Sequence, residues 1–389
     1  MPEPLRLLMF SKDPTLFAEG PAQGDARRRH IRYAQALACA RPGSEIRIVT
    51  HTAAASGHRF DAPADGLRLY GTASPHRLTY VADAARVARS ILQDGWRPDA
   101  ICPQTPWEEG QLGVRLAKRT GARFLPQLHF DLFSAAWRAE RVYYPLLGRI
   151  AEGVLRQATR IRVVSEPLRE AVTAKLGIAM DRVDVIPVSV SLTTAEPGET
   201  AKAALDPRLA GRPVVLFVGR MAPPKNLPLW LDVAEDVLAE APEARFVLVG
   251  DGELEGEVRR RVEAKGLSDQ ILVLGPMAYE ALPEAYAAAD LLLLTSDNEG
   301  FGRVLLEAAE AGVPAVATRC SGPMDVIADG VSGYLLDLGD RAGLGEAVLR
   351  LLRDPVLRAR MGAAARASAS QDFGRESLTQ RLIEHWTAP

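Results

Sequence analysis

Residues 295–307 read TSDNEGFGRVLLE, and four consecutive leucines precede them. The leucines predict a buried strand, because continuous apolar runs are typical of a parallel sheet that is covered on both faces. The polar residues and glycines that follow predict a loop, and a helical pattern begins at Arg303. Glu299 therefore falls in the loop, and Glu307 falls about one turn inside the helix. These two carboxylates are either ordinary surface acids or the two ends of one site.

The same alternation of short apolar runs and longer amphipathic stretches extends along the chain. It predicts strands at 5–10, 46–50, 67–70, 100–102, 123–128, 160–164, 184–186, 214–219, 245–250, 271–275, 291–295, 314–318 and 333–336. A small, polar stretch at 188–200, flanked by prolines, suits a linker. We therefore predict an α/β protein with two doubly wound domains, 1–195 and 196–371, that face each other across a cleft. Ligands of such sheets bind beyond the carboxyl ends of the strands, so the loops after the strands should carry the chemistry.

The composition is that of an ordinary globular protein. Of 389 residues, 47% are hydrophobic and 25% are charged, and the net charge of -2 gives no basic field for nucleic acid. The three cysteines lie far apart without metal-ligand spacing, which fits a reducing compartment. The first residues lack the apolar core and cleavage site of a signal peptide, and no apolar run approaches the length of a membrane span. We expect a cytoplasmic protein.

The loop after the predicted strand at 214–219 carries two cations, Arg220 and Lys225, and Asn226 is suited to cap the helix that follows. Cations beside a helix N-terminus form an anion site, because free backbone N–H groups and the helix dipole add to their charge. A phosphate or diphosphate is the ligand that such a site predicts. Two solvated loop charges are the alternative interpretation of the same residues.

The loop in the opening stretch predicts the other side of this ligand site. Gly300 and Gly302 let the main chain approach a ligand without side-chain obstruction. The carboxylates of Glu299 and Glu307 accept hydrogen bonds from hydroxyl groups, and sugars and riboses offer hydroxyl groups in pairs. The spacing therefore suits a ligand that lies over the helix N-terminus with one carboxylate at each end.

Five motifs of the second half resemble those of the retaining glycosyltransferases of family 4, which have the two-Rossmann-domain fold called GT-B. The motifs are FVGR-x4-K at 217–225, LVGDGE at 248–253, EGFGRVLLE at 299–307, AGVPAVAT at 311–318 and DVIADGVSGYLL at 325–336. The resemblance implies that the second domain binds a nucleotide-diphospho-sugar and that the first domain binds the acceptor. It also implies that the C-terminal helix, 372–389, crosses back and completes the first domain.

The resemblance also implies roles for the site residues. Arg220 and Lys225 would hold the diphosphate and stabilise charge on the leaving group, and Glu307 would bind the ribose hydroxyls. Glu299, with the backbone of the glycine-bearing loop, would hold the donor sugar. The implied donor-binding residues are Gly219, Met277, Gly300, Phe301, Gly302 and Glu307. The family usually needs no metal or other cofactor, and the two cations would take the place of Mg²⁺.

The first half matches the family less well. The family usually carries a paired-glycine loop after the first strand, whereas this chain has the separated glycines Gly20 and Gly24, followed by a helix rich in arginine. The loop backbone and one arginine suit phosphate contact, and a solvated basic helix face is the alternative. His129 and Asp131 follow the predicted strand at 123–128, and His129 resembles the family's active-site histidine near the donor sugar.

The segment 137–160 places five arginines within about 100° of arc if it forms one helix, with aromatic residues beside them. Such a surface is suited to contact with anionic lipid at the membrane face, and hence to a lipid-linked acceptor. A solvated face over an apolar core stripe fits the pattern equally well. Pro145 and Gly148 are positions where the helix is prone to kink or split.

We therefore predict a retaining glycosyltransferase that moves a sugar from a UDP-sugar, or else a GDP-sugar, to a hydroxyl of a glycan or lipid-linked acceptor. The predicted catalytic residues are Arg220, Lys225, Glu299 and His129. The alternatives are another GT-B enzyme, such as a phosphorylase or a nucleotide-sugar epimerase, and an inactive nucleotide-sugar-binding protein. A dinucleotide oxidoreductase is disfavoured, because no G-x-G-x-x-G follows the first strand.

Overall fold

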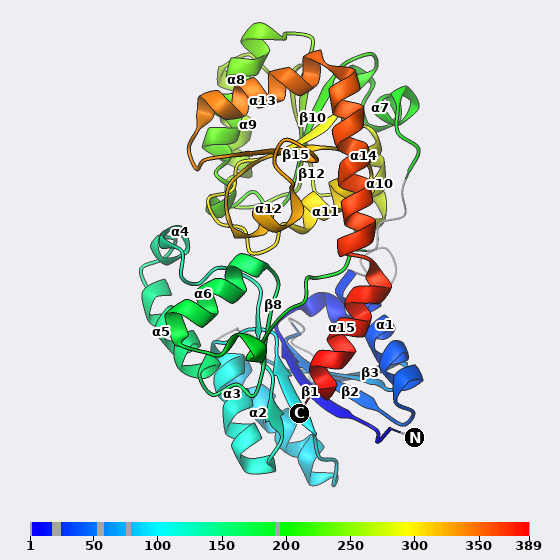
Figure 1. Ribbon diagram of the computed structural model, residues 1–389, viewed down its shortest axis with the longest axis vertical. Coiled ribbons are helices and arrows are strands. Elements are labelled where there is room, and N and C mark those ends of the chain that lie inside the picture. The colour runs from blue at the N-terminus through cyan, green and yellow to red at the C-terminus, as the bar shows by residue number, and fades with distance from the viewer. Residues whose placement is uncertain (1, 18–24, 53–57, 75–78, 191–194, 389) are drawn as a thin grey trace.

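The computed structural model describes residues 2–17, 25–52, 58–74, 79–190 and 195–388. The chain forms two α/β lobes, one above the other in Figure 1, and each lobe is built around a largely parallel sheet that helices cover. The predicted α/β architecture with two doubly wound sheets is confirmed. The exact domain bounds stay a prediction.

The main sheet of the N-terminal lobe has the strand order β3-β4-β2-β1-β5-β6, and only β3 runs antiparallel to its neighbour. Its strands are β1 (Arg6–Ser11), β2 (Glu45–Thr50), β3 (Arg59–Ala64), β4 (Leu67–Gly71), β5 (Ala100–Pro103) and β6 (Arg123–Phe124). Sequence analysis missed β3, because this edge strand is largely exposed and has no apolar run.

A small parallel sheet lies beside the main one, with β7 (Gln127–Leu128), β8 (Ile161–Val163) and β9 (Val183–Val185) in that order. The prediction of one strand over 123–128 is therefore wrong: the chain leaves one sheet after Phe124 and enters the other at Gln127. Pro126 lies between them, and a proline has no N–H to give to a continuous strand ladder. This transition places the end of β7, and the residue after it, at the cleft.

The sheet of the C-terminal lobe has the order β12-β11-β10-β13-β14-β15, and all neighbouring strands are parallel. Its strands are β10 (Val214–Val218), β11 (Arg245–Val249), β12 (Ile271–Gly275), β13 (Leu291–Leu294), β14 (Ala315–Thr318) and β15 (Gly333–Leu336). Every residue of β10 and β13 is buried, as their continuous apolar runs predict. The strand order reverses between β10 and β13, and a ligand crevice is expected beyond the ends of these two strands.

Helices cover both sheets. In the N-terminal lobe they are α1 (Asp25–Ala40), α2 (Tyr80–Gln93), α3 (Glu108–Thr120), α4 (Ala135–Ala139), α5 (Tyr144–Leu155) and α6 (Glu166–Leu176). In the C-terminal lobe they are α7 (Glu199–Leu205), α8 (Leu227–Glu240), α9 (Glu255–Ala264), α10 (Leu282–Ala287), α11 (Arg303–Glu310), α12 (Ser321–Val326), α13 (Arg341–Arg353) and α14 (Pro355–Asp372). The helix predicted to begin at Arg303 is α11.

The last helix, α15 (Arg375–Thr387), packs against α1 in the N-terminal lobe, where red and blue ribbons lie side by side in Figure 1. Trp386 is buried there, and its ring meets that of Tyr33 edge-on at a centroid distance of 6.0 Å. Arg123 of β6 donates from Nη2 to the Trp386 carbonyl over 2.7 Å. The helix is therefore part of the core of the lobe in which the chain starts.

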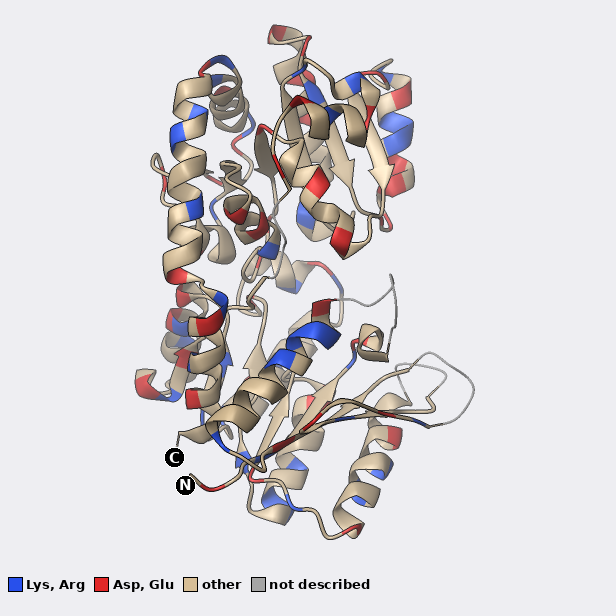
Figure 2. Ribbon diagram, turned by 90° about the vertical axis from the view of Figure 1, so that its right-hand side faces the viewer, with Lys and Arg blue, Asp and Glu red and all other residues tan. Residues whose placement is uncertain are grey.

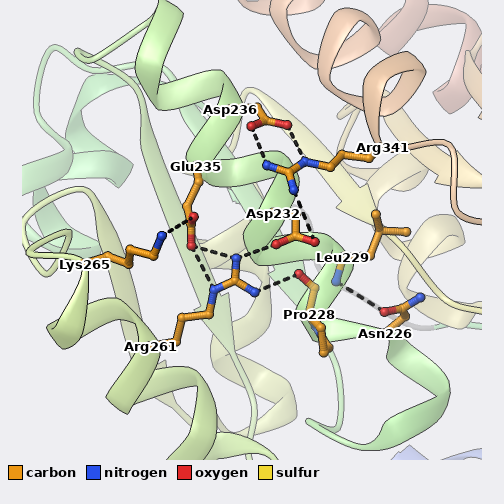
Figure 3. Close-up of polar contacts among 9 residues, drawn as sticks. All are labelled: Asn226, Pro228, Leu229, Asp232, Glu235, Asp236, Arg261, Lys265 and Arg341. Atoms are coloured by element: carbon orange, nitrogen blue, oxygen red, sulfur yellow. Dashed lines mark hydrogen bonds and ion pairs between the residues drawn. The ribbon is translucent and has the colours of Figure 1, made fainter.

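Helix α8, which follows the cationic loop, is held firmly in place. Arg261 of α9 and Arg341 of α13 each pair with acids on α8 (Figure 3). Asn226 caps the helix as predicted, because its Oδ1 accepts the N–H of Leu229 over 3.3 Å. The loop between β10 and α8 therefore leads into a fixed helix start.

Candidate functional site

The loops after β10 and β13 meet at the switch point of the C-terminal sheet, which is the place where its strand order reverses. Lys225 Nζ forms an ion pair with Glu299 Oε2, and Asn226 Nδ2 donates to Asp297 Oδ1 over 3.0 Å. Thr295 Oγ1 donates to the carbonyl of Lys225 over 3.1 Å. The cationic loop and the acidic loop, which sequence analysis treated as two sides of one ligand site, therefore contact each other directly.

A cavity of about 410 Å³ lies between the two lobes at this point, a volume within the usual range for small-molecule sites. Its walls include Arg29, Gln104 and His129 from the N-terminal lobe, and Lys225, Glu299 and Phe301 from the C-terminal lobe. Gly300 lets the lobes approach, because a Cβ at this position would lie 2.0 Å from the carbonyl oxygen of His129. The structure thus brings Lys225, Glu299 and His129 together around one space.

His129 follows β7 and presents a neutral imidazole to the cavity. Burial lowers the pKa of His129 to about 3, and the charges of Arg162 and Arg29 act in the same direction. Its Nε2 is enclosed and has no hydrogen-bond partner among the residues that the structure describes. An enclosed polar atom of this kind is costly unless something bonds to it. A ligand hydroxyl in the cavity is suited to that role.

Glu307 lies inside α11, behind the cavity wall. Its Oε2 accepts the hydroxyl of Tyr286 over 2.8 Å, and Arg303 Nη2 lies 3.4 Å from its Oε1. Burial raises the pKa of Glu307 to about 7, and the positive charge of Arg303 opposes that rise. The carboxylate is therefore poised between its neutral and its ionised form at neutral pH, and Arg303 favours the ionised form.

Arg220 points into a neighbouring cavity of about 300 Å³, which Glu140, Arg141 and Glu253 also line. The two predicted diphosphate cations thus line adjacent cavities in this structure. Glu140 comes from the opposite lobe; burial raises its pKa, while a hydrogen bond from Asn298 and the charge of Arg220 lower it. A carboxylate of the N-terminal lobe therefore lies close enough to balance Arg220.

The remaining predicted donor residues lie around the switch point. Gly219 directly follows β10, with φ of 154° and its N–H bonded to the Val249 carbonyl over 3.0 Å. Gly302 has φ of 76° directly before α11, in the region that favours glycine. Phe301 and Gly302 line the cavity, whereas Met277, in the loop after β12, packs against the core.

The residues predicted to contact phosphate or acceptor in the N-terminal lobe are not all described by the structure. Asp131 accepts the N–H of Phe133 over 2.9 Å and the hydroxyl of Ser321 over 3.1 Å, so it fixes a turn and links the lobes. Gly20 and Gly24 lie outside the described residues.

The arginines at the start of α1 are paired. Arg28 lies 2.5 Å from Glu280 of the other lobe, Arg27 lies 2.5 Å from Asp61, and Arg29 contacts Asp25. Figure 2 shows basic and acidic residues side by side at the end of α1 that points toward the C-terminal lobe. The interpretation of this stretch as a solvated basic face is therefore wrong, because each of the three has an acidic partner.

The segment 137–160 does not form one helix. It splits into α4 and α5, and residues 140–143 turn between them, just before Pro145. Four of its arginines have acidic partners within reach of an ion pair, as follows: Arg138 with Glu152 at 3.2 Å, Arg141 with Glu253 at 3.4 Å, Arg156 with Glu152 at 3.7 Å and Arg160 with Asp184 at 2.7 Å. The continuous basic arc predicted for a single helix is therefore wrong.

Sequence analysis missed Arg303, Tyr286 and Asp25 as neighbours of the site. Arg303 lies four residues before Glu307, a spacing at which side chains of a helix meet, so this contact was open to prediction. Tyr286 and Asp25 reach the site from α10 and α1, and their contacts depend on the tertiary fold.

Within the described ranges, no group of three or more His, Cys, Asp or Glu side chains is arranged to hold a metal ion. The helices that the structure describes include none that is both long and apolar enough to cross a membrane.

Comparison with known proteins identifies the family. The Glycosyl transferase 4-like domain matches residues 29–189, and Glycosyl transferases group 1 matches residues 206–368. A D-inositol 3-phosphate glycosyltransferase of Acidothermus cellulolyticus is 32% identical over 361 residues, which cover 88% of this chain and 76% of that protein. The 2-deoxystreptamine N-acetyl-D-glucosaminyltransferase of Streptomyces fradiae is 29% identical over 317 residues, 78% of this chain and 74% of that protein.

Solved structures share the architecture. The sucrose-phosphate synthase of Thermosynechococcus elongatus has a TM-score of 0.81 and 21% identity, with 97% of each chain covered. Anabaena HepE, in complex with UDP-glucose, has a TM-score of 0.76 and 21% identity, covering 99% of this chain and all of that one. The fold is GT-B, and the protein is a glycosyltransferase. The chain belongs to glycosyltransferase family 4, as the motifs of the second half predict.

Proposed function

We propose that this glycosyltransferase moves a sugar from a UDP-sugar to an acceptor hydroxyl with retention of the anomeric configuration. The observation that carries the proposal is the ion pair of Lys225 with Glu299 at the switch point, across the cavity from the unpartnered Nε2 of His129. These three side chains line one cavity and suit the parts of a nucleotide sugar. The cation suits the diphosphate, and the carboxylate and the neutral imidazole suit hydroxyl groups of the sugar.

The proposed reaction places each group in a defined role. The bond from the anomeric carbon to the diphosphate oxygen breaks, and Lys225 and Arg220 stabilise the negative charge that develops on that oxygen. The acceptor oxygen bonds to the anomeric carbon on the same face of the sugar, and its proton passes to the departing diphosphate. Glu299 and His129 hold sugar hydroxyls, while Glu307 accepts the ribose hydroxyls. No protein base is assigned.

Two positive side chains support metal-independent transfer. Arg220 and Lys225 together supply the two charges that a divalent cation would bring to a diphosphate. In this structure Glu299 neutralises Lys225, and Glu140 lies near Arg220. For the two cations to bind the diphosphate of the donor, Glu299 and Glu140 must therefore move away from them or stay in contact with them beside the phosphates.

Uridine is the proposed base, because HepE, which has the same fold, binds UDP-glucose in its solved complex. The acceptor is proposed to be a hydroxyl of a glycan or of a lipid-linked glycan. The relatives named above act on D-inositol 3-phosphate and 2-deoxystreptamine, so these cyclic polyols belong in the same acceptor panel.

The test is a panel of UDP- and GDP-sugars, first by thermal shift and then by turnover with each acceptor. Bound donor raises the melting temperature, and the rise grows with the logarithm of the ratio of donor concentration to Kd. We expect a UDP-sugar to stabilise the protein, and nucleoside diphosphate to appear only when an acceptor is present. The anomeric coupling constant of the product, measured by NMR, should match that of the donor. Turnover that stops in EDTA and returns with Mg²⁺ would contradict the metal-free proposal.

The same assay separates the alternative functions. A phosphorylase would require inorganic phosphate, and an epimerase would convert the nucleotide sugar without any acceptor. An inactive binding protein would show the thermal shift without turnover across the whole panel.

We also propose membrane contact through the segment 137–160. Because the segment does not form one basic helix, this proposal depends on the exposed residues between α4 and α5. Val142, Tyr143 and Leu146 are exposed large hydrophobic residues between α4 and the first turn of α5, with the exposed Arg149 beyond them. Flotation with vesicles that contain anionic lipid tests it. Val142→Ser with Leu146→Ser should abolish flotation, and equal flotation of this variant would remove the membrane contact from the proposal.

A further inference from the structure

Arg303 is the residue at which the two lobes and the ribose carboxylate meet. It is the first residue of α11, its side chain is two-thirds buried, and it lines the cavity between the lobes. Nη2 lies 3.4 Å from Glu307 Oε1 on its own helix. The same nitrogen lies 3.0 Å from Oδ2 of Asp25, the first residue of α1 in the opposite lobe. One guanidinium therefore contacts carboxylates of both lobes.

The surroundings of Arg303 restrict its side chain. Its guanidinium lies over the ring of Tyr279, 5.7 Å from the centroid, and Nη2 approaches the Tyr279 hydroxyl at 3.5 Å. Arg28 of α1 pairs with Glu280, the next residue along that loop, at 2.5 Å. The start of α1 thus meets the loop after β12 and the start of α11 together, and Arg303 is central to this contact.

The contacts around Asp25 and Arg303 are incomplete. Asp25 also contacts Arg29, yet its Oδ1 is enclosed and unpartnered within the described residues, and so is the Nε of Arg303. A partly satisfied buried network responds strongly to the loss of any one member. Such a network is suited to transmit a change at Glu307 to the other lobe.

We propose that Arg303 is a positioning residue that orients Glu307 for the donor ribose and, through Asp25, couples nucleotide binding to the docking of the N-terminal lobe. This inference rests on the proposed ribose role of Glu307. Arginine suits the task because its planar fork can face two carboxylates at once, whereas the ammonium of lysine is a single point charge. A lobe that moves away takes Asp25 from Arg303 and leaves Arg303 to Glu307 alone.

The first measurement is nucleotide affinity by calorimetry, with UDP, GDP and ADP as probes and the tightest of them used throughout. Arg303→Gln should weaken binding by about tenfold, because a buried carboxylate loses its positive partner. Arg303→Lys should recover only part of that loss, because its single ammonium restores positive charge beside Glu307 but cannot face both carboxylates at once. Arg260→Gln, on the exposed face of α9, is the matched control and should bind as the unaltered protein does. Equal melting temperatures would show that each variant is folded.

The second measurement is a double-mutant cycle with Asp25→Asn. Alone, Asp25→Asn should weaken nucleotide binding by about threefold, because Arg303 loses its second anchor. In the Arg303→Gln background it should add nothing further, so the double variant should bind like Arg303→Gln. Effects that multiply, to about thirtyfold, would overturn the coupling between the lobes.

The third measurement is the pH dependence of nucleotide-sugar binding. The charged or titratable groups that act on Glu307 are Arg303 and Glu310 of its own helix, Tyr286 of α10 and Asp25 of α1. Without Arg303 the pKa of Glu307 rises further, so the midpoint of the binding curve should move to higher pH in Arg303→Gln and return in Arg303→Lys. A merely structural role would leave this midpoint in place.

The variant Glu307→Gln distinguishes a failure of the inference about Arg303 from a failure of the proposed function. If it weakens nucleotide binding while Arg303→Gln does not, the positioning role is wrong and the proposed function stands. If Glu307→Gln binds as tightly as the unaltered protein, the ribose role itself is wrong, and the inference about Arg303 falls with it.

Discussion

The two lobes place different chemistry at equivalent points of their sheets. At the C-terminal switch point, Lys225 pairs with Glu299, and both side chains line the cavity. At the N-terminal switch point, between β1 and β5, Lys12 pairs with an acid at the start of α3. The neighbouring Glu109 is fully buried and accepts the N–H of Thr105 over 3.1 Å. The same topology thus directs charge toward a cavity in one lobe and toward its own loop in the other.

The cores of the two lobes also differ in how many polar groups they contain near the sheets. The C-terminal sheet is apolar at its centre, where β10 and β13 consist of buried hydrophobic residues. The small N-terminal sheet instead contains a buried cation, Arg162, which donates to Gln127 Oε1 over 2.8 Å and to the carbonyls of Ile186 and Pro187 over 2.9 and 3.0 Å. A buried polar network therefore lies within the small sheet of the N-terminal lobe, whereas the centre of the C-terminal sheet is packed by apolar side chains alone.

The largest expected effect comes from the paired lysines. Lys225→Ala should lower kcat by about 100- to 1,000-fold, since it removes a cation from the site of developing charge. Lys12→Ala, the equivalent change in the other lobe, should leave nucleotide affinity within about twofold, because Lys12 is paired away from the donor. Steady-state kinetics and calorimetry measure both. Equal losses of nucleotide affinity in the two variants would contradict the contrast between the lobes.

Arg220→Ala sharpens the same test. A loss of turnover comparable to that of Lys225→Ala, about 100-fold or more, is expected if Arg220 leaves Glu140 for the diphosphate in the donor complex. Near-normal kcat would show that Arg220 serves the second cavity instead.

Next in size is the effect of the buried cation on stability. Arg162→Leu should lower the free energy of unfolding by about 2–4 kcal/mol, because it leaves Gln127 and two carbonyls without their donor. Urea unfolding measures the change. Arg89→Leu, on the exposed face of α2, is the control and should stay within about 0.5 kcal/mol. An unchanged free energy of unfolding in Arg162→Leu would mean that the core of the N-terminal lobe does not depend on these polar contacts.

A smaller effect is expected from the glycine at which the lobes touch. Gly300→Ala should lower kcat/KM by about tenfold, because the added Cβ meets the His129 carbonyl and forces the lobes apart. Small-angle scattering should show a larger radius of gyration, with little change in melting temperature. The control is Gly153→Ala, since a Cβ there would meet no other described residue within 4 Å beyond the backbone of its own helix. Unchanged scattering together with full activity would disprove the close approach.

The smallest effect expected is a pH dependence. Because burial raises the pKa of Glu307 to about 7, the fraction of ionised carboxylate increases between pH 6 and pH 8. Nucleotide-sugar affinity should therefore rise by at most about tenfold over that range, since only the carboxylate accepts two ribose hydroxyls. His129 stays neutral throughout, because its pKa is about 3. Glu307→Gln should bind with no such dependence, and a slope that persists in this variant would assign the titration to another group.

The C-terminal lobe was largely predictable from the sequence, and the N-terminal lobe was less so. Each strand of the C-terminal sheet is marked by its own apolar run, and the loops that carry Lys225 and Glu299 follow directly from those runs. The edge strand β3 and the split of 123–128 between two sheets have no such marker, because exposure and a proline decide them. The residues around Arg303 depend on helix packing across the lobes, which local periodicity does not report.

Helix α15 has a consequence for how the protein is made. It supplies the buried Trp386 to a lobe whose other elements lie almost two hundred residues earlier in the chain. Domains generally fold as they leave the ribosome, the earlier one first. Here the earlier lobe lacks a piece of its core until the later lobe has been synthesised. During translation the C-terminal lobe is therefore free to mature ahead of the N-terminal lobe, whose core is completed last.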